Sequence, residues 1–149
     1  MIFTLTLVAI LIGTLMPIQA GLNAELTRFI KHPYLGALIS FFTGFLALSI
    51  IVLLHKSPLT ELKRLPEANP VLFLGGILGA LFVGSSIFLI PRMGATSMIA
   101  AFVTGQLLMS VVIDHYGLLG IQSTPLGLTR VIGVVLLFAG LYLILKKAA

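Results

Sequence analysis

The amino-acid sequence predicts an all-α membrane protein with five transmembrane helices. Of its 149 residues, 59% are hydrophobic and 9% are charged, whereas a soluble globular domain has about 25% charged residues. Five long apolar stretches each approach the roughly 20 residues that a helix needs to cross the hydrocarbon core. Helices satisfy their own backbone polar groups in lipid, and five such segments are too few for a closed barrel. We expect one transmembrane domain over residues 1-149, with helices at about 2-24, 34-54, 70-90, 94-114 and 127-146.

The first predicted helix contains a proline and two amides. The first 24 residues contain no Lys or Arg, so this segment differs from a secretory signal, which starts with basic residues. Pro17 cannot donate a hydrogen bond to the carbonyl of Gly13, so we expect a bend there and treat Pro17 as a candidate hinge. A kink that serves packing alone is an equal alternative. Gln19 and Asn23 are candidates for lining a polar path, because amides are costly against lipid.

The second and third predicted helices carry small residues at four-residue spacing. The second helix has Gly36, Ser40 and Gly44, and the third has Gly75 and Gly79. Small residues at this spacing let helix backbones approach closely in a membrane. We therefore interpret these positions as packing seams. The segment between the two helices is basic and leucine-containing, which is typical of a chain lying at the membrane interface.

The fourth predicted helix has two different faces. At about 100° per residue, Gln106, Ser110 and Asp114 form one polar stripe. Small residues occupy roughly the opposite side, at Ser97, Ala101 and Gly105. We expect the small-residue face to pack against another helix and the polar face to meet the bundle interior or a water-filled path. Gln106 and Ser110 thus join the two amides of the first helix as candidate substrate-path residues.

Charged residues gather where the fourth helix ends and the fifth begins. The helix dipole disfavours an anion at a helix C-terminus and a cation at an N-terminus. A salt bridge between Asp114 and Arg130 would relieve both mismatches. Alternatively, Asp114 and His115 would load protons in exchange for substrate, because histidine titrates near neutral pH. Both interpretations stay open on the sequence.

The basic residues show almost no bias between the two sides of the membrane. The side of the N-terminus receives four, namely Lys56, Lys63, Arg64 and Arg130. The other side receives five, namely Arg28, Lys31, Arg92, Lys146 and Lys147. Such a balance predicts insertion in either orientation, and two oppositely inserted copies would form the inverted pair of many transporters. We predict an antiparallel dimer in which Gln19 and Asn23 of one copy approach Asp114 and Ser110 of the other.

Several classes of function are disfavoured. The chain has no cysteine, so disulfides and thiolate sites are absent. It also lacks a phosphate-binding glycine loop, a His-Glu metal spacing and a serine nucleophile turn, so we expect no enzyme, cofactor or metal. The basic residues lie singly at span ends, which argues against a nucleic-acid partner. The expected partners are a small-molecule substrate, the lipid bilayer, and a second copy or another half-size chain.

Five stretches carry a resemblance to a known family. They are IQAGLNAEL at 18–26, ALISFFTGFLAL at 37–48, LGGILGALFV at 74–83, IPRMGAT at 90–96 and GQLLMSVVIDHYG at 105–117. The chain resembles the drug/metabolite transporter superfamily, in particular the half-size YdcZ-type family of bacterial inner-membrane proteins. One departure is that family members tend to have a tryptophan before the Gly-Gly of the third helix, whereas this chain has no tryptophan.

The resemblance implies half of an inverted-repeat transporter in the bacterial inner membrane. Together with the helical faces, it predicts a secondary transporter that exports a small metabolite or amphipathic compound by alternating access. Two alternatives stay open: a non-transporting membrane subunit that stabilises a partner, and a lipid flippase.

Overall fold

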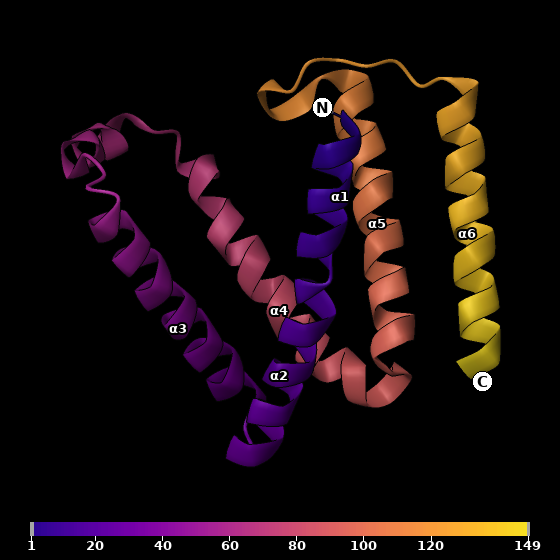
Figure 1. Cartoon of the computed structure of the whole chain (residues 1–149), viewed down its shortest axis with the longest axis horizontal. Coiled ribbons are helices and arrows are strands. Elements are labelled where there is room, and N and C mark those ends of the chain that lie inside the picture. The colour runs from indigo at the N-terminus through magenta and orange to yellow at the C-terminus, as the bar shows by residue number, and fades with distance from the viewer. Residues whose placement is uncertain (1, 149) are drawn as a thin grey trace. The chain divides into compact units, whose positions relative to one another are not determined.

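The computed structural model describes residues 2–148, with side chains described as far as Lys146, and is helical throughout its spans (Figure 1). Among the described residues, five helices are long and apolar enough to cross a membrane. The prediction of an all-α protein with five transmembrane helices is therefore confirmed. The chain packs as two compact units, one ending at Pro91 and one beginning at Arg92, and each is described by itself. The single transmembrane domain stays a prediction.

The first span consists of two helices, α1 (Ile2–Gly13) and α2 (Leu15–Ile30). The interruption falls at Thr14, whose hydroxyl donates to a carbonyl one turn earlier at 2.7 Å. Pro17 has no N–H for the carbonyl of Gly13, so the helix breaks beside the carbonyl that the proline leaves unpaired. The bend thus lies just before Pro17 in the chain, and the role of this proline as a hinge stays a prediction.

Helix α2 continues to Ile30, beyond the end near residue 24 that hydropathy predicts. Glu25 and Arg28 form an ion pair of 2.7 Å on its exposed surface, and pairs at this spacing support a helix after it leaves the hydrocarbon. Lys31 ends the helix in the left-handed conformation, with φ of 60°. The next helix, α3 (Pro33–Leu54), starts with proline at its first position, where the missing N–H costs no hydrogen bond. The connection is therefore much shorter than predicted.

Two 3₁₀ helices connect α3 to the third span. They are η1 (Leu59–Glu67) and η2 (Pro70–Phe73), and α4 (Leu74–Met93) follows directly. The side chain of Asn69 caps η2 by accepting a hydrogen bond from the backbone N–H of Val71 at 3.0 Å. These helices complete the first unit.

The second unit consists of α5 (Ala95–Tyr116), the short η3 (Leu118–Gly120) and α6 (Leu128–Ala148). Helices α5 and α6 pack against each other and run antiparallel (Figure 1). Gly117 ends α5 with φ of 63°, a conformation that favours glycine. A Cβ here would also lie 3.2 Å from the Cβ of Ser123. Glycine therefore permits the tight return of the chain toward α6.

Candidate transport site

Helix α2 presents a polar stripe to α3. Gln19, Asn23 and Thr27 follow one another at four-residue spacing and therefore share one helix face. Both ends of this stripe meet α3: a Cβ at Gly36 would overlap Thr27 Oγ1, and Gln19 lines a cavity together with Ser40. Helices α2 and α3 are packed directly against each other. The stripe consequently lies at the seam between them.

Two polar atoms of the stripe are buried without a hydrogen-bond partner. Asn23 is only 5% exposed, and neither its Nδ2 nor Thr27 Oγ1 has a partner among the described residues. Such an unpaired buried group costs about 1–3 kcal/mol by mutational estimates. The hydroxyls of Ser86 and Thr104, in contrast, donate to backbone carbonyls of their own helices at 2.7 and 2.8 Å. The stripe on α2 thus has two buried polar atoms that form no hydrogen bond within the described part of the chain.

A cavity of about 340 Å³ lies at the Gln19 end of this seam. Its polar side chains are Gln19 from α2 and Ser40 from α3, and the rest of its lining comes from Phe41, Gly44, Phe45 and Leu48. One part of the cavity therefore offers hydrogen bonds, while the other part offers apolar and aromatic surface. Ser40, predicted as a packing residue, lines this cavity beside Gln19, and its packing role stays a prediction.

The predicted packing glycines of the first unit fall into two groups. Gly36 is buried against Thr27, and a Cβ at Gly79 would lie 3.8 Å from the ring of Phe41 on α3. A Cβ at Gly44 or Gly75 would meet no atom within 4 Å in the described part of the chain. The first group lies at helix contacts inside the unit. For the second group, a packing role stays a prediction and would need a contact from outside this chain.

In the second unit, the polar face of α5 is exposed. Gln106 and Ser110 are both exposed, and they lie about 100° and 140° around the helix from Gly105. Gly105 lines a groove between α5 and α6, so the amide and the hydroxyl point away from α6. Ser97 on the small-residue face is buried, and Ala101 is partly buried. The amide-bearing face of α5 is therefore left uncovered by side chains of the second unit.

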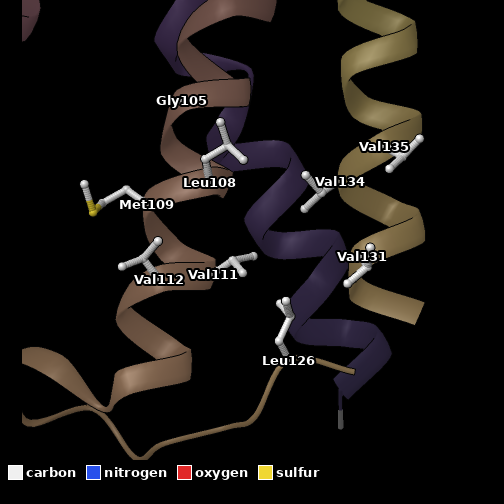
Figure 2. Close-up of a pocket in the computed structure, with 9 residues that line it drawn as sticks. All are labelled: Gly105, Leu108, Met109, Val111, Val112, Leu126, Val131, Val134 and Val135. Carbon is white, nitrogen blue, oxygen red and sulfur yellow. The ribbon is translucent and has the colours of Figure 1, made fainter. Parts of the chain in front are cut away.

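The groove between α5 and α6 has a volume of about 420 Å³ and an entirely apolar lining. Figure 2 shows Leu108 and Val111 of α5 facing Val131 and Val134 of α6. A Cβ at Gly105 would meet nothing within 4 Å in the described part of the chain. Of the three small residues on this face of α5, Gly105 lines the groove beside α6, and the packing role of the face stays a prediction.

A polar cluster ties the loop after α5 to the end of that helix. Arg130 Nη1 lies 3.3 Å from Asp114 Oδ2, and the side chains are 38% and 35% exposed. His115 Nδ1 accepts a hydrogen bond from the backbone N–H of Leu126 at 3.2 Å. The hydroxyl of Ser123 donates to the carbonyl of His115 at 2.9 Å. These contacts hold the loop against the C-terminal end of α5.

Thr27 is a site residue that the sequence analysis missed. Extending the spacing of Gln19 and Asn23 by one more step of four reaches it directly, so the signal was present in the sequence. The sequence does not reveal that this stripe lies beside Gly36 and Ser40, because those contacts depend on the register between α2 and α3.

A family model described as "Putative inner membrane exporter, YdcZ" matches residues 4–143. The match covers nearly the whole chain and confirms the resemblance carried by its sequence motifs. Together with the five apolar helices, it identifies a multi-pass protein of the inner membrane. No curated protein and no solved structure matches the chain.

Proposed function

The chain belongs to the YdcZ family of inner-membrane exporters, and from this premise we propose that it is a secondary transporter working by alternating access as an antiparallel dimer. It exports a small metabolite or amphipathic compound. Gln19, Asn23, Gln106 and Ser110 line the polar path, and Pro17 provides a hinge. The observation that carries the proposal is the exposed amide and hydroxyl on α5, a helix otherwise apolar enough to span the membrane.

The exposed face of α5 supports a path because polar side chains are costly against lipid. Such groups in membrane helices face a bundle interior or a water-filled cavity. In one copy of the chain, Gln106 and Ser110 are not covered. A second copy, inserted in the opposite orientation, supplies the missing wall and leaves an aqueous path between the two copies. The even distribution of basic residues on the two sides is consistent with insertion in both orientations.

Export can be tested without knowing the substrate. Proteoliposomes containing the purified chain alone are loaded with a soluble metabolite extract, given a pH gradient and analysed by mass spectrometry for compounds that leave. We expect protein-dependent loss of at least one class of compound. The loss should be abolished in Gln106→Leu and retained in Met109→Leu, an exposed residue on the same helix. Absence of any protein-dependent loss would favour a non-transporting subunit, and movement of labelled lipid alone would favour a flippase.

The Asp114–Arg130 pair gives a prediction about proton coupling. We propose that it pins the loop between α5 and α6, because the carboxylate is already engaged with the guanidinium. Asp114→Asn should then lower the unfolding free energy by at most about 1 kcal/mol, the range for partly exposed ion pairs. The pH dependence of export should be the same as in the parent chain. Loss of that pH dependence in Asp114→Asn would assign proton loading to Asp114 and contradict the purely structural role.

A further inference from the structure

We propose that the seam between α2 and α3 is a binding site for an uncharged, hydrogen-bonding small molecule with an apolar or aromatic part. The site comprises the cavity lined by Gln19 and Ser40, together with the buried Asn23, one helical turn from Gln19 on the same face of α2. The export of such a compound rests on the proposed function. Its binding depends only on the residues between α2 and α3.

The unpartnered atoms show what the ligand must supply. Nearly all buried polar groups in proteins have a hydrogen-bond partner, and a low dielectric raises the cost of leaving one unpaired. Asn23 Nδ2 and Thr27 Oγ1 are buried and have none among the described residues. The helical register places Asn23 between Thr27, which meets Gly36, and Gln19, which lines the cavity. A carbonyl, amide or hydroxyl oxygen entering the seam would accept the hydrogen bond that Asn23 can donate.

The charges on α2 indicate that the ligand is neutral. Helix α2 has two charged residues, Glu25 and Arg28, which pair with each other at 2.7 Å. They lie about 200° and 140° around the helix from Asn23, away from the seam. None of the residues that line the cavity is charged. A charged ligand would therefore lie in a low dielectric without a counter-charge, which is strongly unfavourable.

The apolar wall defines the other part of the ligand. Phe41, Phe45 and Leu48 contribute to a cavity of about 340 Å³, a size near the lower end of small-molecule pockets. Aromatic rings pack favourably against planar groups, either offset or edge to face. The combination fits a compact molecule that has an amide or a similar neutral polar group at one end and a ring or alkyl group at the other.

Three benzene derivatives that differ in charge test this inference. Benzamide is neutral, benzoate is anionic and benzamidinium is cationic, and all three have nearly the same shape. Binding of each to the full chain in nanodiscs is measured by saturation-transfer difference NMR. We expect benzamide to bind the parent chain and to bind about fivefold more weakly to Gln19→Leu and to Asn23→Leu, a change typical of one lost hydrogen bond. Neither charged analogue should show a signal that depends on these positions.

Matched controls separate binding from folding. Thr43→Val removes a hydroxyl that already bonds the carbonyl of Ile39 at 2.9 Å, so it should leave benzamide binding unchanged. Asn23→Leu should keep or raise the melting temperature, because it removes an unpaired buried amide. Equal benzamide signals in the parent, Gln19→Leu and Asn23→Leu would overturn the site, as would equal dependence on Asn23 for benzoate or benzamidinium. Site-dependent binding without vesicle export would instead leave this inference standing and contradict the proposed function.

Discussion

Replacing Gly36 by alanine is expected to destabilise the first unit by about 1–3 kcal/mol, the usual cost of overpacking a tight contact. The added Cβ would overlap Thr27 Oγ1 and would lie 3.3 Å from the Cα and Cβ of Thr27. Because backbone atoms are involved, rotation of the threonine side chain cannot relieve the whole contact. Thermal unfolding of the purified protein in detergent measures the effect as a lower melting temperature.

Two further variants show whether the contact itself causes the loss. Gly44→Ala, two helical turns along the same face of α3, places a Cβ in open space and should change the melting temperature little. Thr27→Ala in the Gly36→Ala background removes the overlapping hydroxyl and should restore part of the stability. Similar melting temperatures for Gly36→Ala and Gly44→Ala would show that α2 and α3 do not pack in the register described above.

Cysteines placed at positions 19 and 110 are expected to cross-link between chains rather than within one. The chain has no cysteine of its own, so a bifunctional thiol reagent acts only at the introduced sites. In an antiparallel dimer, the C-terminal half of the first span (Ile2–Ile30) in one copy shares a leaflet with the C-terminal half of α5 in the other. Gln19 and Ser110 are both exposed, whereas Asn23 is 5% exposed, so the pair 19 and 110 is more accessible than a pair that uses 23.

Two differently tagged chains make this cross-link decisive. One chain carries Gln19→Cys and the other carries Ser110→Cys, so only contact between chains yields a product that has both tags. Pairing Gln19→Cys with Gly105→Cys is the control, because Gly105 is turned toward α6. We expect a doubly tagged product for the first pair and a much weaker one for the control. A third sample carries Gln19→Cys and Ser110→Cys in the same chain. Cross-linking within that chain, with no doubly tagged product from the two separate chains, would contradict the antiparallel dimer.

The helices could be predicted from the sequence because long apolar runs have few other structures open to them in lipid. Their ends were harder to predict. Helix α2 extends past the apolar residues, where Glu25 pairs with Arg28. This is a local effect, which hydropathy averages over a longer window and therefore does not resolve. The interruption at Thr14, in contrast, was indicated by Pro17, which leaves the carbonyl of the neighbouring Gly13 without an N–H partner.

The candidate site was only partly predictable. Periodicity identified Gln19, Asn23, Gln106 and Ser110 as members of polar stripes, because helical spacing alone determines which residues share a face. It could not reveal that Asn23 Nδ2 lacks a partner, because that depends on every neighbouring element. The contact of His115 with Leu126 joins residues eleven positions apart through a loop, and no helical spacing indicates it.

The central claim is that water reaches the amide-bearing face of α5, and cysteine accessibility along this helix tests it most directly. Single cysteines are introduced into the cysteine-free chain in membrane vesicles and treated with a hydrophilic methanethiosulfonate reagent. We expect rapid modification along the polar line, at residues 96, 99, 103, 106, 110 and 114, and protection at residues 97, 101 and 105. Protection at 106 and 110, or equal reactivity around the whole helix, would contradict an aqueous path on this face.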